Sequence, residues 1–359
     1  MKVFYTWEQA QQGNVYDPDF GKNIQWDIPL LEGYDYAFVR NTSSHPGSGH
    51  YKGIINPDLI REVEAWGPDA ILVFGWNFQS HLASLRHFHG KIPVLFRGDS
   101  TLLDEKPGIK KYIRRLSLKW VYSHVDYALY TGTNNKDYFL RHGLKESQLF
   151  FAPHAIDNQR FAEPDNSYST RAQVWRKDLG IEKTDLVLLF AGKLETKKNP
   201  FFILELAEAI PDKRWKFIVA GNGKLEQQLK QAAAADPRIL FIDFQNQLLM
   251  PVVYRLADVF IMPSTGPGET WGLAANEAMA SGKSIMLSAK TGSAIDLVKG
   301  DRNGIIFNPG DVQRCIQFMN GAVSDKSALN RMELASREII REYSFEHIST
   351  AIANIIKQL

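Results

Sequence analysis

Two glutamates in the second half of the chain lie on either side of a predicted helix start. Glu269 and Glu277 are eight residues apart in the run IMPSTGPGETWGLAANEAMASG, from Ile261 to Gly282. Its composition predicts a glycine-rich loop that carries Glu269 and a helix over 271–280 that carries Glu277. Glycines let a backbone approach a ligand closely, and the amides of a first helical turn attract an anion. A ligand with phosphates and hydroxyl groups fits this pattern, and a sugar nucleotide has both.

A second group of charges follows a predicted strand over 186–191. The segment after it, GKLETKKNP, contains Gly192, Lys193 and Lys198. Its final pair, Asn199-Pro200, has the residue types of an N-cap and a first helical residue. Fixed cations between a strand end and a helix start can stabilise the charge that develops on a departing diphosphate. The alternative interpretation is a solvated basic turn.

The glutamate segment resembles the E-x7-E element of the retaining glycosyltransferases of family 4, which have the GT-B fold. The lysine segment resembles the G-R-L-x-x-x-K-G motif of that family, with Lys193 at the arginine position and Lys198 at the lysine position. Lysine keeps the charge of arginine but loses its bidentate geometry. The glutamate element matches at Pro263-Ser264, Glu269, Trp271-Gly272-Leu273, Glu277-Ala278-Met279-Ala280 and Gly282, with two extra residues before Glu269.

The resemblance implies transfer of a sugar from a nucleotide-diphosphate sugar to an acceptor hydroxyl, with retention at the anomeric carbon. It implies no metal and no cofactor besides the donor itself. In this view Lys193, Lys198 and the amides near Trp271-Gly272-Leu273 stabilise the leaving diphosphate. Glu269 orients the sugar, and Glu277 holds the ribose hydroxyls. The implied donor-binding residues are Gly13, Gly192, Lys193, Lys198, Gly221, Phe244, Gln245, Gly268, Thr270, Trp271, Gly272, Leu273 and Glu277.

The first half of the chain resembles the family only in outline. Many members carry a histidine after the fourth strand, where this chain has Arg97-Gly98-Asp99-Ser100. Arg97 could bind sugar or phosphate oxygens, and Asp99 could accept the proton of the acceptor hydroxyl. The alternative is an Arg97–Asp99 pair that braces the strand end. Gly13, in the loop after the first strand, is expected to approach the donor phosphate.

Short apolar runs alternate with amphipathic segments along the whole chain, which predicts an α/β protein with parallel sheets covered by helices on both faces. The resemblance implies two facing Rossmann-like domains with a cleft between them. An acceptor-binding domain would comprise 1–155 together with a C-terminal helix over 344–359, and a donor-binding domain would comprise 156–343. Strands are expected at 2–6, 36–39, 70–74, 93–96, 127–130, 149–151, 186–191, 216–220, 239–241, 259–262, 284–287 and 304–307.

Composition limits the possible partners. A formal net charge of +2 over 359 residues implies no bulk attraction to nucleic acid. The single cysteine, Cys315, excludes an internal disulfide and suits a reducing cytoplasm. We expect no signal peptide before the strand-like opening MKVFYTW, and no membrane span, because no apolar run reaches 18 residues. The Asp-Pro-Asp run at 17–19 is interpreted as a solvated turn rather than a metal site.

The segment 106–121, KPGIKKYIRRLSLKWV, has six basic residues and no acidic one. Its apolar residues Ile109, Tyr112, Ile113, Leu116 and Trp120 recur at helical spacing. We expect this stripe to pack on the sheet and the lysines to face solvent. The alternative is a helix that lies on an anionic membrane. Even a packed helix would present a basic face that draws the protein toward anionic lipid or a lipid-diphosphate acceptor.

Two other functions remain open at this stage. The chain could be a nucleotide-sugar epimerase of the same architecture, or a partner that binds sugar nucleotide without chemistry. The sequence names neither the sugar nor the base. The acceptor could be a glycan, a lipid-linked molecule or a small molecule, because loop side chains rather than the fold decide this choice.

Overall fold

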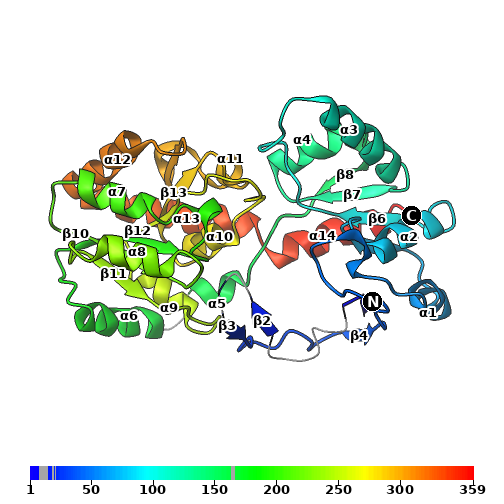
Figure 1. The fold of residues 1–359 in the computed structure, drawn as a ribbon, viewed down its shortest axis with the longest axis horizontal. Coiled ribbons are helices and arrows are strands. Elements are labelled where there is room, and N and C mark those ends of the chain that lie inside the picture. Colours follow the sequence, from blue (N-terminus) through cyan, green and yellow to red (C-terminus); the bar gives the residue numbers. More distant parts are fainter. Residues whose placement is uncertain (8–14, 18–19, 21, 163–165) are drawn as a thin grey trace. The chain divides into compact units, whose positions relative to one another are not determined.

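A computed structural model of the chain describes residues 1–7, 15–17, 20, 22–162 and 166–359. The chain divides into two compact units (Figure 1). Unit 1 consists of Met1–Val15, Ile28–Pro153 and Glu346–Leu359, and unit 2 consists of Tyr16–Asp27 and His154–Phe345. The first unit therefore ends two residues before the boundary expected from the sequence, and the chain returns to it two residues later than expected.

Unit 2 is built on a parallel sheet. Its strands are β9 (Leu186–Ala191), β10 (Trp215–Ala220), β11 (Ile239–Ile242), β12 (Val259–Met262), β13 (Ser284–Ser288) and β14 (Gly304–Phe307). Within the described residues they pair in the order β11-β10-β9-β12-β13-β14, with every pairing parallel. This is the strand order of a Rossmann fold, whose direction of winding reverses between β9 and β12.

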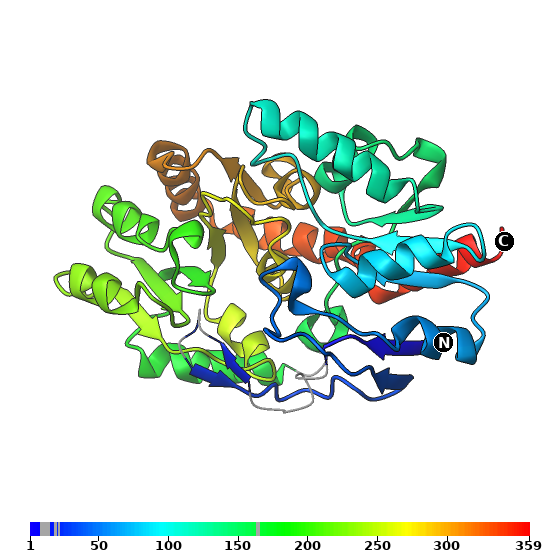
Figure 2. The ribbon, with the colours of Figure 1, turned by 45° about the vertical axis from the view of Figure 1, so that its right-hand side comes forward.

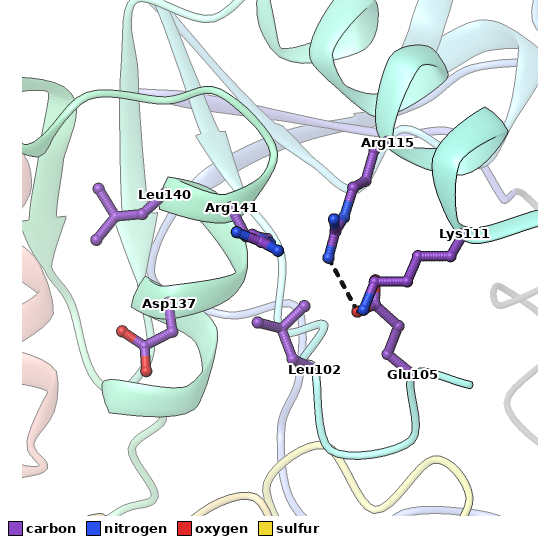
Figure 3. Close-up of a pocket in the computed structure, with 7 residues that line it drawn as sticks. All are labelled: Leu102, Glu105, Lys111, Arg115, Asp137, Leu140 and Arg141. Carbon is purple, nitrogen blue, oxygen red and sulfur yellow. Dashed lines mark hydrogen bonds and ion pairs between the residues drawn. The ribbon is translucent and has the colours of Figure 1, made fainter. Parts of the chain in front are cut away.

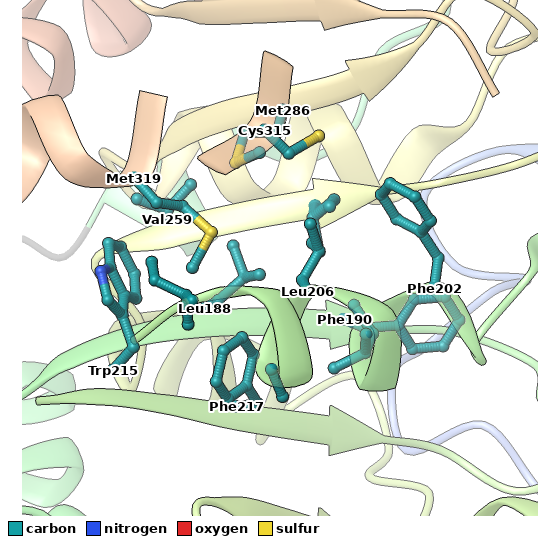
Figure 4. Close-up of a cluster of buried hydrophobic side chains, with 14 of the residues drawn as sticks. Leu188, Phe190, Phe202, Leu206, Trp215, Phe217, Val259, Met286, Cys315 and Met319 are labelled. Carbon is teal, nitrogen blue, oxygen red and sulfur yellow. The ribbon is translucent and has the colours of Figure 1, made fainter. Parts of the chain in front are cut away.

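Helices cover both faces of this sheet, which explains why most residues of its strands are apolar. On one face, Leu188 and Phe217 pack with Phe202 of α7 and Met319 of α12 (Figure 4). Cys315 lies in this same core and acts as a small apolar residue, as expected. On the other face, α10 and α13 contact β13. The helices are α7 (Phe202–Ala209), α8 (Glu226–Ala233), α9 (Met250–Arg255), α10 (Leu273–Ala280), α12 (Val312–Ser324) and α13 (Lys326–Ile339).

Shorter elements complete unit 2. They are α5 (Asn158–Ala162), α6 (Ser167–Asp178), α11 (Ala294–Leu297), and the 3-10 turns η4 (Thr196–Lys198), η5 (Gly300–Arg302) and η6 (Ile340–Glu342). The turn η4 corrects one sequence expectation. Asn199 does not cap a helix: it ends η4 in the left-handed conformation, with φ 50°, and α7 begins three residues later at Phe202. Asparagine tolerates this conformation better than most residues, which explains its use here.

Unit 1 contains a second parallel sheet, with the described strands in the order β5-β6-β7-β8, and a separate parallel pair of β1 and β4. On one face of the sheet, Phe96 and Ala128 pack against helix residues such as Leu118 of α3. The strands are β1 (Lys2–Tyr5), β4 (Asp35–Phe38), β5 (Ile71–Phe74), β6 (Val94–Arg97), β7 (Tyr127–Tyr130) and β8 (Leu149–Phe151). The helical elements are η2 (Tyr51–Gly53), α1 (Leu59–Trp66), α2 (Gln79–Phe88), α3 (Ile109–Tyr122), α4 (Thr133–Arg141) and η3 (Glu146–Gln148).

The last helix, α14 (Phe345–Ile356), closes the other face of the unit 1 sheet (Figure 1, Figure 2). Its Ala351 and Ile355 pack against Leu95 of β6 and Leu129 of β7. Unit 1 is therefore assembled from segments at both ends of the chain.

Residues 16–27 belong to unit 2, although the sequence had assigned them to the first domain. A short pair of strands that was not predicted, β2 (Val15–Asp17) and β3 (Lys22–Ile24), begins one residue before this segment. The side-chain amide of Asn246 donates to the carbonyl of Gln25 at 2.5 Å, and the amide of Leu248 donates to the Asp27 carboxylate at 3.1 Å. These bonds hold the segment on the loop that follows β11.

The orientation of α3 differs from the expectation. The helix packs on unit 1 through Leu118, Val121 and Tyr122, and the stripe from Ile109 to Trp120 is exposed. The predicted packing of that stripe on the sheet is therefore wrong. In the described part of the chain, no helix has the length and apolar character needed to cross a bilayer.

Candidate functional site

The predicted donor residues lie in loops that leave the carboxyl ends of the unit 2 strands. Gly192 follows β9, Gly221 follows β10, Phe244 follows β11 and Glu269 lies in the loop after β12. Because parallel strands end at the same edge of a sheet, these loops share one edge. Ligands of open α/β sheets bind at this edge, where the winding reverses. Here that point lies between β9 and β12.

Lys198 and Glu269 meet at this point. The Lys198 ammonium forms an ion pair with Oε2 of Glu269, whose side chain is only 7% exposed. Ser264 donates its hydroxyl to the same carboxylate oxygen at 3.1 Å. A main-chain bond of 2.9 Å from the amide of Thr265 to the carbonyl of Lys197 fastens the two loops together. The arrangement thus holds a cation and an acid side by side at the expected ligand edge.

The backbone of Glu269 is fixed by the loop after β13. The amide of Gly292 donates to the Glu269 carbonyl at 2.9 Å. A Cβ on Gly292 would lie 1.7 Å from the carbonyl oxygen of Thr270, so only glycine allows this approach. Gly268 has φ +89°, which also favours glycine. Gly268 and Thr270, both predicted to bind the donor, therefore shape the loop that presents Glu269.

Gly192 and Gly221 have a packing role. A Cβ on Gly221 would lie 2.1 Å from the carbonyl oxygen of Gly192. The next glycine of the turn, Gly223, would likewise bring a Cβ within 2.6 Å of the Leu194 carbonyl oxygen. The loops after β9 and β10 consequently touch backbone to backbone at the residues before and after Lys193. These contacts fix the backbone that carries the Lys193 side chain.

Glu277 lies on α10 and is half-buried. The phenolic hydroxyl of Tyr254 donates to its Oε2 at 2.7 Å. Burial raises the pKa of the Glu277 carboxyl above its ordinary value, and the hydrogen bond from Tyr254 acts in the opposite direction. This carboxylate can accept hydroxyl hydrogen bonds, but keeping it ionised is harder here than in water.

Trp271 points into the unit rather than toward a ligand. Its indole is 4% exposed, and Nε1 donates to Oδ1 of Asn276 at 2.8 Å. The Asn276 side-chain amide in turn donates to the His154 carbonyl at 3.0 Å. The helix α10 begins at Leu273, two residues later than predicted, after Gly272 in the left-handed conformation at φ 92°. What Trp271, Gly272 and Leu273 can offer an anion is therefore their backbone.

Aromatic rings lie against the predicted base-contacting loop. The Lys193 ammonium is 5.0 Å from the ring centroid of Phe20, and the Phe20 ring meets that of Phe244 edge-on at 4.9 Å. The amide of Phe244 donates to Oδ1 of Asn222 at 2.8 Å. Gln245 donates its side-chain amide to the Asp243 carbonyl at 3.0 Å. Phe20 thus connects one predicted phosphate-binding lysine to the predicted base loop.

In unit 1, Arg97 braces the end of a neighbouring segment. Its two terminal nitrogens donate to the carbonyls of Ala152 at 2.7 Å and Pro153 at 2.8 Å. Burial lowers the pKa of the Arg97 guanidinium, and the nearby charge of Asp99 opposes this shift. The alternative expected from the sequence was an Arg97–Asp99 pair that braces the strand end. Arg97 does have a bracing role, and the groups that it holds are the main-chain carbonyls of Ala152 and Pro153. Gly13 lies outside the described residues.

Metal ligands do not gather in the part of the chain that the structure describes. No three histidine, cysteine, aspartate or glutamate side chains there are grouped so that they could hold a metal ion. Two residues of the Asp-Pro-Asp run at 17–19 lie outside that part.

Residues 172–339 match the model of the glycosyl transferases group 1 family. This segment is similar to the group 1 glycosyl transferase domains. It includes Lys193, Lys198, Glu269 and Glu277.

Curated relatives are similar over a larger part of the chain. The sulfoquinovosyl transferase SQD2 of Arabidopsis thaliana is 25% identical over 316 residues, which are 84% of this chain and 58% of that protein. A D-inositol 3-phosphate glycosyltransferase of Xylanimonas cellulosilytica is 24% identical over 224 residues, or 60% of this chain and 53% of that protein. The chain spans about half the length of the curated relatives it matches.

Solved structures share the fold. Anabaena Alr3699/HepE in complex with UDP matches with a TM-score of 0.71 at 18% identity, over 90% of this chain and 86% of that one. Sucrose-phosphate synthase from Thermosynechococcus elongatus matches with a TM-score of 0.70 at 16% identity, over 99% and 88% of the two chains. Together with the two parallel-sheet units, these likenesses show the GT-B fold predicted from the sequence.

Sequence reasoning missed the contacts of several residues that support the candidate site. Ser264 and Tyr254 donate to the two glutamates, and Asn222 and Asn276 hold Phe244 and Trp271 in place. Ser264 is one of the matched positions of the glutamate segment, and Asn222 directly follows Gly221, so a search for hydrogen-bonding side chains at and beside these positions would have found them. Tyr254 is 23 residues before Glu277, and no local pattern connects them.

Proposed function

We propose that this chain is a retaining, family 4 glycosyltransferase that transfers a sugar from a nucleotide-diphosphate sugar to an acceptor hydroxyl. The observation that carries the proposal is the Lys198–Glu269 pair at the reversal point of the unit 2 sheet. A fixed cation and a fixed carboxylate at this edge suit a ligand with a phosphate beside a hydroxyl-bearing sugar. The group 1 domain and relatives named as glycosyltransferases support this assignment.

In the proposed reaction, the departing diphosphate carries the developing negative charge. Lys193, Lys198 and the first amides of α10 lie at the edge where that charge would form, so they stabilise the transition state. Glu269 accepts hydrogen bonds from the sugar once the diphosphate draws Lys198 away from it. Glu277 accepts hydrogen bonds from the ribose hydroxyls. The diphosphate itself takes the acceptor proton on the face from which it leaves.

We propose that lysines rather than a metal ion neutralise the diphosphate. Two ammonium groups in the loop after β9 supply the positive charge that a divalent cation supplies elsewhere. We assign a hexosyl group to the donor. The UDP bound to a structural neighbour makes UDP the first nucleotide to test.

The acceptor is assigned to unit 1, and glycan, polysaccharide or glycolipid assembly is the proposed setting. Asp99 is proposed to orient the acceptor hydroxyl, and Arg97 contributes by holding the segment at Ala152 and Pro153 in place. Gly13 keeps its proposed role beside the donor phosphate. We propose that the reaction takes place in the cytoplasm, where the buried thiol of Cys315 stays reduced.

A donor screen tests the proposal first. Thermal unfolding is measured with UDP, GDP, ADP and their sugar conjugates, with magnesium and with EDTA. Stabilisation by one nucleoside diphosphate that persists in EDTA is expected. The Lys198→Ala variant should lose it and Lys197→Ala should keep it, because the neighbouring Lys197 pairs with Glu195 instead. No stabilisation at millimolar ligand would contradict the donor site.

Product analysis then identifies the chemistry. With donor and a panel of lipid, glycan and small-molecule acceptors, transfer with retained anomeric configuration is expected. A changed sugar in the absence of acceptor would indicate an epimerase. Binding without any product would indicate a sugar-nucleotide-binding partner.

A further inference from the structure

The helix α3 has two apolar sides, and only one of them is used inside unit 1. Leu118, Val121 and Tyr122 are buried in the core with Phe96 and Phe139. The opposite side consists of Ile109, Tyr112, Ile113, Leu116 and Trp120, which are between 48% and 76% exposed. At about 100° per residue these five fall within one arc of roughly 100°. We refer to them as the outer arc of α3.

Such an arrangement reverses that of an ordinary surface helix, in which the apolar side faces the core and the polar side faces water. Single exposed apolar residues are common on proteins, but contiguous apolar patches mark interaction surfaces. Nothing in the packing of unit 1 requires the outer arc to be apolar, because Leu118, Val121 and Tyr122 already anchor the helix. We therefore expect the outer arc to contact a partner.

Lysines flank the outer arc. On the helical wheel Lys110 lies beyond one border of the arc and Lys119 beyond the other. Neither forms an ion pair with any residue that the structure describes, and the same holds for Lys106 just before the helix. The segment 106–121 contains no acidic residue. A partner on this surface meets apolar side chains in the middle and positive charge on both sides.

Two further cations of α3 share one carboxylate within the unit. Lys111 and Arg115 both bind the carboxylate of Glu105, at 2.5 Å and 3.3 Å (Figure 3). They line a hollow of about 590 Å³ between α3 and α4, to which Asp137 and Arg141 also contribute. Glu105 thus offsets part of the positive charge on this side of the helix, and Arg114 donates to the Tyr138 hydroxyl at 3.2 Å. Lys110 and Lys119 add their charge directly beside the outer arc.

We propose that the outer arc of α3 docks unit 1 on an anionic lipid surface, with the helix lying in the plane of the interface. Apolar side chains enter the acyl boundary while flanking lysines bind the headgroups, a combination that characterises interfacial helices. A second copy of the chain suits this surface less well, because a symmetric contact would bring the same lysines against one another. The proposal is independent of the proposed transfer reaction and of donor binding.

Vesicle flotation of the full chain tests the docking. We expect binding to vesicles of phosphatidylcholine mixed equally with phosphatidylglycerol, weaker binding as salt increases, and little binding to phosphatidylcholine alone. The double variant Ile113→Glu/Leu116→Glu should weaken binding by about tenfold or more, because two apolar side chains no longer enter the interface. The double variant Lys110→Gln/Lys119→Gln should weaken it by about fivefold per lysine.

Matched controls separate docking from general surface effects. Leu334, on α13 of unit 2, is 69% exposed, close to the 72% of Leu116. Leu334→Glu should leave vesicle binding unchanged, as should Lys213→Gln at another exposed position of unit 2. All substituted side chains are exposed, so the thermal melting curves of the variants should coincide with that of the unmodified chain.

Three results would overturn the proposal. The first is no flotation with anionic vesicles at low salt. The second is equal flotation of the Ile113→Glu/Leu116→Glu and Leu334→Glu variants. The third is a dimer in light scattering that the first variant dissociates while vesicles bind neither form, which would assign the outer arc to a second copy of the chain.

Discussion

Lys198 and Glu269 form an ion pair although 71 residues separate them along the chain. They meet because β9 and β12 are neighbours in the sheet while β10 and β11 lie on the far side of β9. Each residue occupies the loop after its own strand, so the reversal of strand order brings the cation and the acid together. The pair thus places a cation beside a buried carboxylate at the point where the strand order reverses.

Removing either charge should abolish most of the activity. In Lys198→Ala or Glu269→Ala, we expect turnover to fall at least about a hundredfold, the cost of losing a positioned electrostatic group. Lys197→Ala serves as the control and should stay within about twofold, because the side chain of this partly exposed lysine pairs with Glu195 and not with Glu269. Steady-state kinetics with the donor found in the thermal screen measures this. Near-normal rates in both site variants would refute the assignment.

Donor binding should depend on pH through Glu277. Burial raises the pKa of this carboxyl, so it becomes protonated at a higher pH than an ordinary glutamate. In its proposed role, the ionised form accepts hydrogen bonds from the ribose hydroxyls. Binding should therefore be full above the raised pKa and weaken as pH falls through it. Calorimetric titration with nucleoside diphosphate across this range measures the effect. In Glu277→Gln the acid-side loss should disappear, and an unchanged profile would show that another group titrates.

Asn222 should act on donor affinity through the base loop. Asn222→Ala removes the acceptor of the Phe244 amide at 2.8 Å and a donor to Asp243 at 3.2 Å. We expect the KM for the donor to rise about tenfold with little change in kcat, because the loop is loosened but the charged groups remain. Initial rates at varied donor concentration separate the two constants. A loss confined to kcat would contradict a positioning role.

Replacing glycine by alanine should lower the free energy of unfolding at one position and raise it at another. Gly221→Ala places a Cβ 2.1 Å from the Gly192 carbonyl oxygen, so we expect a loss of about 3 kcal/mol or more in the free energy of unfolding. Gly321→Ala lies in α12 with open space around it and should stabilise by about 0.5–1 kcal/mol through helix propensity. Urea denaturation compares them. Equal effects would mean that the contact between the two loops is not tight.

Arg97 should prove more important for stability than for binding. Arg97→Ala leaves the carbonyls of Ala152 and Pro153 without their buried donor, which should cost about 2–3 kcal/mol of unfolding free energy. Arg97→Lys keeps the charge and should recover part of this stability. Urea denaturation and donor titration are measured together on both variants. A large loss of activity in Arg97→Lys at unchanged stability would instead favour direct contact with the substrate.

The sheets could be predicted from the sequence because their strands are buried on both faces. Runs such as 186–191 and 259–262 are continuously apolar, and the structure places β9 and β12 on those residues. The pair of β2 and β3 was missed, since each is three residues long and carries polar side chains. Length and composition therefore limit what periodicity can reveal.

Periodicity located the apolar stripe of α3 but could not say which way it faces. The helix has a second apolar side at Leu118, Val121 and Tyr122, and only tertiary packing decides between the two. Similarly, the Asn199-Pro200 pair is a good local signal for a helix start, yet the left-handed turn at Asn199 delays α7 until Phe202. The local preference of Asn199-Pro200 for a helix start is thus overridden by the tertiary contacts of this loop, which include the pair of Lys198 and Glu269.

The candidate site could be predicted as a set of residues but not as a set of contacts. The motifs identified Lys198, Glu269 and Glu277 by type and spacing. Tyr254, which holds Glu277, comes from α9, and nothing in the spacing of the two residues connects them. Only the fold brings these helices together.

The position of α14 in unit 1 has a consequence for biosynthesis. During translation, Leu95 and Leu129 leave the ribosome long before Ala351 and Ile355, which cover them. All of residues 154–345 are made in between, so unit 2 can fold while one face of the unit 1 sheet is still bare. A nascent chain stalled before residue 346 should therefore recruit chaperones through that face, and the same chain released with α14 should not.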